Sequence, residues 1–138
     1  MVTGEFLAEM LPRQLAAEQA LCSGDAEPRR QTWSHREPVT VLGAAGIPVR
    51  RGWDEVSTLF KHLAGRFSGV DAYEFELLAA GASGDLAYTV GFEHKTVVVE
   101  GETSTYSLRV THVYRREDGV WKIVHRHGDH VDPAEVRR

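Results

Sequence analysis

Three ionisable side chains in the last third of the chain could together support proton transfer. His127 and Asp129 are two residues apart, so they share one face if the last predicted strand continues through Gly128. A histidine can move a proton near neutral pH, a carboxylate can orient its ring, and Arg109 can hold an anionic or enolate oxygen. We therefore predict His127, Asp129 and Arg109 as candidate catalytic residues. The alternative is that they form a structural ion-pair network.

Strand alternation places further residues on the same face of a predicted sheet. A two-residue turn at residues 100–101 pairs Phe92 with Arg109, and a three-residue turn at residues 117–119 pairs Arg109 with His127. This face is apolar at one end and polar at the other, so we expect it to line a cavity for a small molecule. The candidate ligand-binding residues are Tyr88, Phe92, Thr111 and His125 on this face, with Trp33 after the second predicted helix.

The opposite face mixes apolar and polar side chains and is too apolar for a fully solvated surface. Its members are Ala87, Thr89, Gly91, Glu93, Val110, His112, Tyr114, Lys122, Val124 and Arg126. We expect this to be the outer face of the sheet and to form a homodimer interface, which assigns His112 to the dimer. The alternative is a wet sheet surface with scattered apolar residues.

A histidine pair in the last predicted strand raises the question of a metal site. His125 and His127 alternate along the strand and point the same way, and imidazole is a ligand of zinc and nickel. However, their spacing matches no known zinc motif, and Cys22, the single cysteine, is distant in the sequence. We therefore predict no metal, with a metal-dependent enzyme as the minor alternative. We also predict no other cofactor.

The elements that must position these residues follow from hydrophobic spacing. Leu7, Leu11 and Leu15 predict a first helix that starts or kinks at Pro12. Three helices and one early strand are followed by a meander of long antiparallel strands, which is an α+β pattern. The other predicted elements are a helix at residues 25–34, a strand at 38–43, a helix opening at Trp53, and strands around 73–77, 86–99, 102–116 and 120–127.

Length and composition indicate one globular domain spanning residues 1–138. Hydrophobic residues make up 42% of the chain and charged residues 26%, with a net charge of −4. No basic cluster is present to neutralise phosphates, and no apolar run is long enough to cross a bilayer, so we predict neither a nucleic-acid nor a membrane partner. The single cysteine and the lack of a secretory signal predict a cytoplasmic location, and the excess of Arg over Lys is typical of a GC-rich bacterial genome.

Short motifs, together with the order of helices and strands, carry a family resemblance. They are Arg109-x-Thr111, Arg115, Asp118-Gly119-x-Trp121 and Val124-His125-x-His127, preceded by Trp33, residues 39–43 and Gly52-Trp53. On these residues nearly the whole chain resembles the nuclear transport factor 2-like superfamily, above all its SnoaL-like domains. It is also similar to the association domain of calcium/calmodulin-dependent kinase. The resemblance implies a cone-shaped, cystatin-like α+β roll, with three N-terminal helices packed on a strongly bent, mixed but mostly antiparallel sheet.

The resemblance leaves the function open between enzyme and assembly domain. The first predicted helix lacks the Tyr that ketosteroid isomerases carry there, and Thr111 stands where the Asp-Arg-Asp relay of epoxide hydrolases would need a carboxylate. SnoaL-like cyclases place an acidic base late in the chain, which Asp129 matches. We expect a small-molecule-binding domain and, if it is an enzyme, a cofactor-independent isomerase, cyclase or dehydratase. The alternative is a non-catalytic dimerisation, association or ligand-sensing domain.

Overall fold

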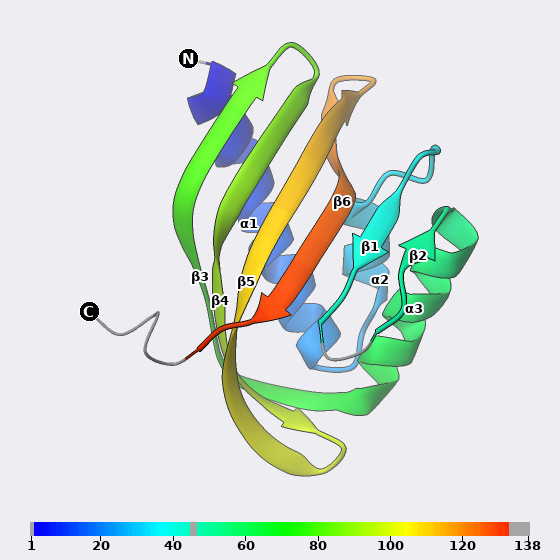
Figure 1. Ribbon diagram of the computed structural model, residues 1–138, viewed down its shortest axis with the longest axis vertical. Coiled ribbons are helices and arrows are strands. Elements are labelled where there is room, and N and C mark those ends of the chain that lie inside the picture. The colour runs from blue at the N-terminus through cyan, green and yellow to red at the C-terminus, as the bar shows by residue number, and fades with distance from the viewer. Residues whose placement is uncertain (1, 45–46, 133–138) are drawn as a thin grey trace.

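The computed structural model describes residues 2–44 and 47–132. Its helices are α1 (Val2–Cys22), α2 (Glu27–Thr32) and α3 (Trp53–Arg66). Its strands are β1 (Thr40–Leu42), β2 (Arg50–Arg51), β3 (Phe67–Ser83), β4 (Leu86–Val99), β5 (Glu102–Glu117) and β6 (Val120–His130). The strands form one sheet in the order β2-β1-β6-β5-β4-β3, and the helices lie against one side of it (Figure 1). The predicted α+β fold is confirmed.

The sheet is mixed and strongly bent. Its strands pair antiparallel except where β1 runs parallel to β6. Strand β3 shifts its register against β4 at three places along its 17 residues. Because such bulges bend a strand and increase its twist, the long hairpins curve toward α3 at the end where β3 begins (Figure 1). The curved sheet and the helices together enclose the interior of a cone.

The two long hairpins differ in how well their register could be predicted. The β4–β5 hairpin pairs in the predicted register along its whole length. The β5–β6 turn has two residues rather than three, because Asp118 and Gly119 take positive φ angles of 52° and 81°, which suit a type I′ turn. A bulge after Val113 shifts the pairing again. As a result, Arg109 lies opposite Asp129 and not opposite a histidine.

Helix α1 buries a stripe that differs from the predicted one. Phe6, Met10, Gln14 and Glu18, four residues apart, face the sheet and are buried, whereas Leu15 is exposed. The helix also continues through Pro12 instead of starting there. The prediction followed the leucines because they were the most apolar periodic set. The sheet surface opposite α1 is partly polar, so polar side chains of the helix are buried against it.

Aromatic side chains pack the apolar part of the core. Phe6 meets Tyr114 and Trp121 edge to face, with ring centroids 4.8 and 5.0 Å apart. Trp33, which follows α2, packs in the same way against Phe60 of α3 at 5.0 Å. These contacts hold the helices on the sheet.

The helices cover the face of the sheet that was predicted to be the outer one. The buried residues of this inner face include Ala87, Thr89, Glu93, His112, Tyr114 and Arg126. The predicted cavity-lining set is therefore the outer face, and the assignment of His112 to a dimer interface is wrong. The error arose in β6. The predicted three-residue turn places Trp121 and Ile123 on the face of Tyr88 and Phe92, whereas the observed turn places these two large apolar residues on the same side as Tyr114. Among the described residues, no helix is long and apolar enough to span a membrane.

Candidate functional site

A cavity of about 340 Å³ lies between the inner face of the sheet and the helices, near the end of β4. Much of its wall is apolar and includes Val41, Ile47, Leu59, Leu63, Val99 and Leu108. Its polar lining includes Arg29, Arg66, Lys95, Tyr106, Arg126 and His130. Among the described lining residues there is no carboxylate, so the polar wall of the cavity is mainly cationic.

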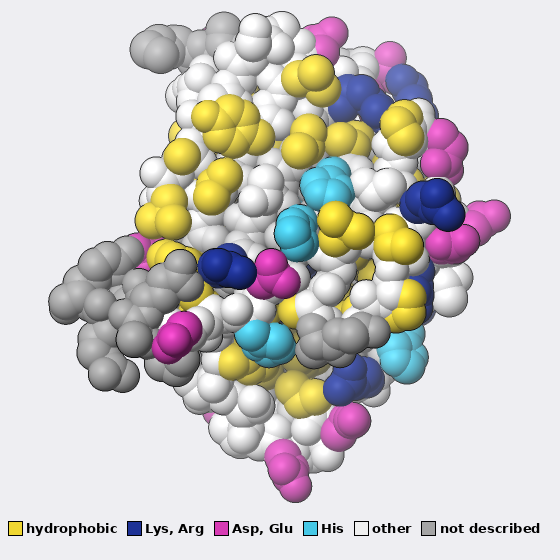
Figure 2. Space-filling view, viewed as in Figure 1, with side chains coloured by type: hydrophobic (Ala, Val, Ile, Leu, Met, Phe, Trp, Pro, Cys, Tyr) yellow, Lys and Arg dark blue, Asp and Glu magenta, His cyan; other side chains and the backbone are white. Residues whose placement is uncertain are grey.

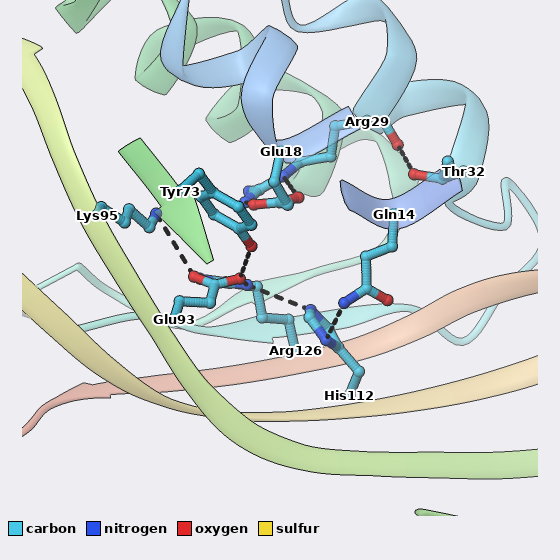
Figure 3. Close-up of polar contacts among 9 residues, drawn as sticks. All are labelled: Gln14, Glu18, Arg29, Thr32, Tyr73, Glu93, Lys95, His112 and Arg126. Atoms are coloured by element: carbon cyan, nitrogen blue, oxygen red, sulfur yellow. Dashed lines mark hydrogen bonds and ion pairs between the residues drawn. The ribbon is translucent and has the colours of Figure 1, made fainter. Parts of the chain in front are cut away.

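Two buried carboxylates lie behind these cations. Glu18 of α1 accepts hydrogen bonds from Arg29 of α2 through both carboxylate oxygens, one of them at 2.8 Å. Both side chains are almost fully buried, and Figure 3 shows the pair between the two helices. Although burial alone would raise the pKa of Glu18, the Arg29 charge holds it below its usual value. Glu18 is therefore a carboxylate in the folded protein.

The second carboxylate, Glu93, joins β3, β4 and β6. Arg126 donates to both oxygens of Glu93 at 2.8 Å, and the Tyr73 hydroxyl donates to it at 2.8 Å. Lys95 Nζ lies 3.5 Å from Glu93 Oε1 (Figure 3). Burial opposes ionisation, but Arg126 and Lys95 outweigh it and hold the pKa of Glu93 well below its usual range. A carboxylate held in this way is a weak base, so it positions cations rather than removing protons.

His112 of β5 lies behind Arg126 in the same network. Arg126 Nη1 donates toward His112 Nε2 at 3.3 Å, and the Gln14 amide lies 3.4 Å from Nδ1. Burial, followed by the positive charge of Arg126, lowers the pKa of His112 from 6.5 to about 3. His112 is thus a neutral acceptor that fixes the guanidinium, and it does not line the cavity.

The predicted catalytic residues come together, but on the outer face of the sheet. His127 Nε2 and Arg109 Nη2 lie 3.4 and 3.5 Å from Asp129 Oδ2, and all three side chains are about half exposed. They border a shallow groove of about 260 Å³ that also includes Phe92 and Thr111. Ion pairs at this exposure are weak, because water screens them. The outer groove and the cavity open on opposite faces of the sheet.

The predicted ligand-binding residues are not gathered in one site. Trp33 is buried in the core, whereas Tyr88 is 46% exposed on the outer face. His125 lies beside β1, where its Nδ1 is 2.8 Å from Thr40 Oγ1, and burial lowers its pKa. None of the five residues predicted to bind ligand is among the described residues that line the cavity. No group of three His, Cys, Asp or Glu side chains in the described parts of the chain could hold a metal ion.

The charged residues in and behind the cavity wall leave one signal in the sequence. In β4, Glu93 and Lys95 occupy alternate positions in line with Ala87 and Val97, which are buried in the structure. Charged residues within an otherwise buried series indicate a polar site inside the fold. Sequence reasoning missed them because the inner and outer faces were exchanged.

Figure 2 looks onto the outer face of the sheet. Apolar side chains gather over β3 and β4, and histidines gather over β6 and its neighbourhood. The exposed apolar residues of this face include Leu78 at 50%, Leu86 at 57% and Tyr88. Such a patch on a sheet is typical of a surface that contacts another protein.

Comparison with solved structures identifies the fold. A dehydratase candidate of the NTF2-like family from Streptomyces avermitilis is 20% identical, with a TM-score of 0.75 over 94% of this chain and 98% of that one. A ketosteroid isomerase-like protein from Erwinia carotovora atroseptica is 17% identical, with a TM-score of 0.73 over 92% and 97%. A candidate calcium/calmodulin-dependent protein kinase type II association domain from Thiobacillus denitrificans is 19% identical, with a TM-score of 0.68 over 85% and 88%.

These likenesses extend over most of each chain. An NTF2-like protein with a cystatin-like fold from Novosphingobium aromaticivorans, 18% identical with a TM-score of 0.65 over 97% of this chain and 92% of that one, confirms the cystatin-like roll. No curated protein matches the sequence significantly. A family model described as a SnoaL-like domain matches residues 15–131. Because this match covers most of the sequence, and its elements form the observed cone, the chain belongs to the SnoaL-like domain family.

Proposed function

We propose that the protein binds a small, largely apolar molecule in the cavity and holds one of its oxygen atoms against the buried cations. The observation that carries this proposal is the composition of the cavity wall: apolar side chains surround Lys95 and Arg126, with no carboxylate among the described lining residues. An apolar pocket with a few convergent polar groups is typical of a small-molecule site.

The reaction class that fits this arrangement is cofactor-free proton transfer, as in an isomerase, cyclase or dehydratase. Lys95 and Arg126 would stabilise negative charge that develops on a carbonyl oxygen. Glu93 and Glu18 are poor bases because their own cations hold them ionised. His130, which lines the cavity beside Tyr106 at a ring distance of 5.7 Å, is the group we propose to move the proton.

Native mass spectrometry of the tag-free protein tests the location of the site. We expect a reproducible organic adduct that Leu63→Trp, which fills the cavity, removes. Leu78→Trp on the outer face is the matched control and should retain the adduct. The outer groove is the rival site: loss of the adduct in His127→Ala, with retention in Leu63→Trp, would refute the cavity proposal and favour the sequence-based one. Once the adduct is identified, His130→Ala should abolish turnover but leave binding in place.

We also propose that the outer sheet face forms a homodimer, which would equally suit an association domain. The exposed apolar residues Leu78, Leu86 and Tyr88 support this proposal. We expect sedimentation equilibrium to give a dimer mass, and Leu86→Glu to shift the protein to monomer. Thr58→Glu on α3 is the control, because it adds the same single negative charge at an exposed neutral position away from this face. A wild-type monomer would refute the dimer.

A further inference from the structure

We propose that the cavity selects a molecule with a single negative charge, a monocarboxylate with an apolar body, and that Lys95 binds its carboxylate. This inference rests on the proposed small-molecule function and adds the chemical class of the ligand. Three observations carry it: the balance of buried charge, the geometry of the cations, and the form of the cavity.

The numbers of positive and negative side chains buried inside the cone are not equal. Among the described residues, the buried acids are Glu18 and Glu93, and the buried Arg and Lys side chains are Arg29, Lys95 and Arg126. The remaining buried base, a histidine, is neutral at physiological pH. The interior therefore holds one more positive charge than negative ones. A buried charge without a full partner is unfavourable, and a bound anion would supply the missing partner.

The distances identify Lys95 as the buried cation that is least engaged by a carboxylate, so it can still donate hydrogen bonds to a ligand. Arg29 is engaged by both oxygens of Glu18, and Arg126 donates twice to Glu93 at 2.8 Å. The Lys95 ammonium lies farther from Glu93, at 3.5 Å, and shares that carboxylate with Arg126. Its other charged or aromatic contacts among the described residues are with two tyrosine rings, at 5.8 and 5.9 Å from the ring centroids.

Lys95 is positioned so that its ammonium group can donate hydrogen bonds to a molecule in the cavity. Lys95 is only 5% exposed, yet it lines the cavity wall. In Figure 3 its ammonium lies at one end of the network, whereas Arg126 lies between Glu93 and His112. A lysine ammonium has three donor hydrogens, so contact with Glu93 leaves donors for a ligand carboxylate. Because Arg29 and Arg126, the other buried cations of the cavity wall, are paired with Glu18 and Glu93, the single surplus charge favours a monoanion over a phosphate monoester with two charges.

Matched pairs of ligands test the charge preference. Phenylacetic, 2-naphthylacetic and 4-phenylbutyric acids, each paired with its primary amide, would be titrated by calorimetry into the full-length protein at neutral pH. We expect each acid that binds to do so about 10- to 100-fold more tightly than its amide, which is the range for a hydrogen bond to a charged group. Lys95→Met should remove this preference without abolishing amide binding, and Lys95→Arg should retain it. Lys122→Met, at the other end of the sheet, is the control and should behave as the wild type.

A second measurement separates ligand binding from a structural role. Because Lys95→Met removes the surplus buried cation and leaves the Arg126–Glu93 pair, the ligand-free variant should melt at the same temperature as the wild type or higher. A lysine needed for folding would lower the melting temperature instead, and that result would overturn the proposal.

The binding outcomes distinguish the two levels of inference. Equal affinity of acids and amides for the wild type, or an acid preference that survives Lys95→Met, overturns the role of Lys95 and leaves the cavity as a binding site. Absence of binding by every acid and amide, together with a native spectrum free of adducts, overturns the proposed function as well.

Discussion

The neutral histidine in the polar network makes a quantitative prediction about acid stability. His112 is fully buried, and its pKa falls from 6.5 to about 3 on folding. Between these two values the unfolded chain binds one more proton at this position than the folded protein does. The free energy of unfolding must therefore decrease as the pH falls below 6.5, since protonation favours the unfolded chain.

The size of the effect follows from the same two pKa values. Each pH unit below 6.5 costs about 1.4 kcal/mol of stability until the folded histidine itself titrates near pH 3. From pH 7 to pH 5 the contribution of His112 to stability should fall by about 2 kcal/mol. Measurements should stop at pH 5, because Glu18 and Glu93 also have lowered pKa values and begin to add their own acid sensitivity closer to 4.5.

The perturbation is His112→Gln, which keeps a polar side chain beside Arg126 and Gln14 but does not titrate. Urea unfolding of both proteins at pH 7, 6 and 5 gives two stability profiles. We expect the wild type to lose about 2 kcal/mol more than the variant over this range. The two proteins are compared by how steeply the free energy of unfolding changes with pH, so a loss of stability that is equal at every pH does not affect the result. The titration of His125 contributes equally to both profiles, because this residue is present in both proteins.

Equal slopes would refute the reasoning. They would mean that the imidazole at position 112 either titrates normally in the folded protein or is not buried beside Arg126.

The remaining predictions concern the packing and charge of the same sheet. Glu93→Gln should destabilise the protein by about 3–5 kcal/mol, because it leaves Arg126 buried beside a neutral amide; urea unfolding measures this, and a loss below about 1 kcal/mol would contradict it. Gly91→Ala should cost about 1–3 kcal/mol, since a Cβ there would overlap the backbone carbonyl oxygen of Glu76; an unchanged melting temperature would show that the strands separate easily. Asp129→Asn should change stability by less than about 0.5 kcal/mol, because its ion pairs are half exposed, and a larger change by thermal unfolding would show a stronger structural role.

The polar interior explains why this fold could be predicted better than its site. Strand β4 was predicted with both of its ends correct, because residues 100–101 supply a clear hairpin turn. Helix α3 begins at Trp53 as predicted, where acidic residues follow in the first turn. These features depend on neighbours in the sequence, so they are visible without knowledge of the tertiary contacts.

The location of the candidate site depended on two features of the strand register that local sequence patterns do not reveal. The first was the length of the turn before β6, where Asp118 and Gly119 suffice without a third residue. The second was the bulge after Val113, which reverses the alternation of β6 part of the way along it. Each change moves side chains to the opposite face, because successive residues of a strand point to opposite sides.

The sequence alone determined the order of the elements, the membership of the SnoaL-like family and the two sets of side chains on β4 and β5. The tertiary structure decided which set faces the helices. Both sets contain apolar and ionisable residues, so hydrophobicity does not choose between them. Burial of Glu93, Lys95 and Arg126 became favourable only when strands β4 and β6 and their counter-charges met across the sheet, a contact between residues 33 positions apart.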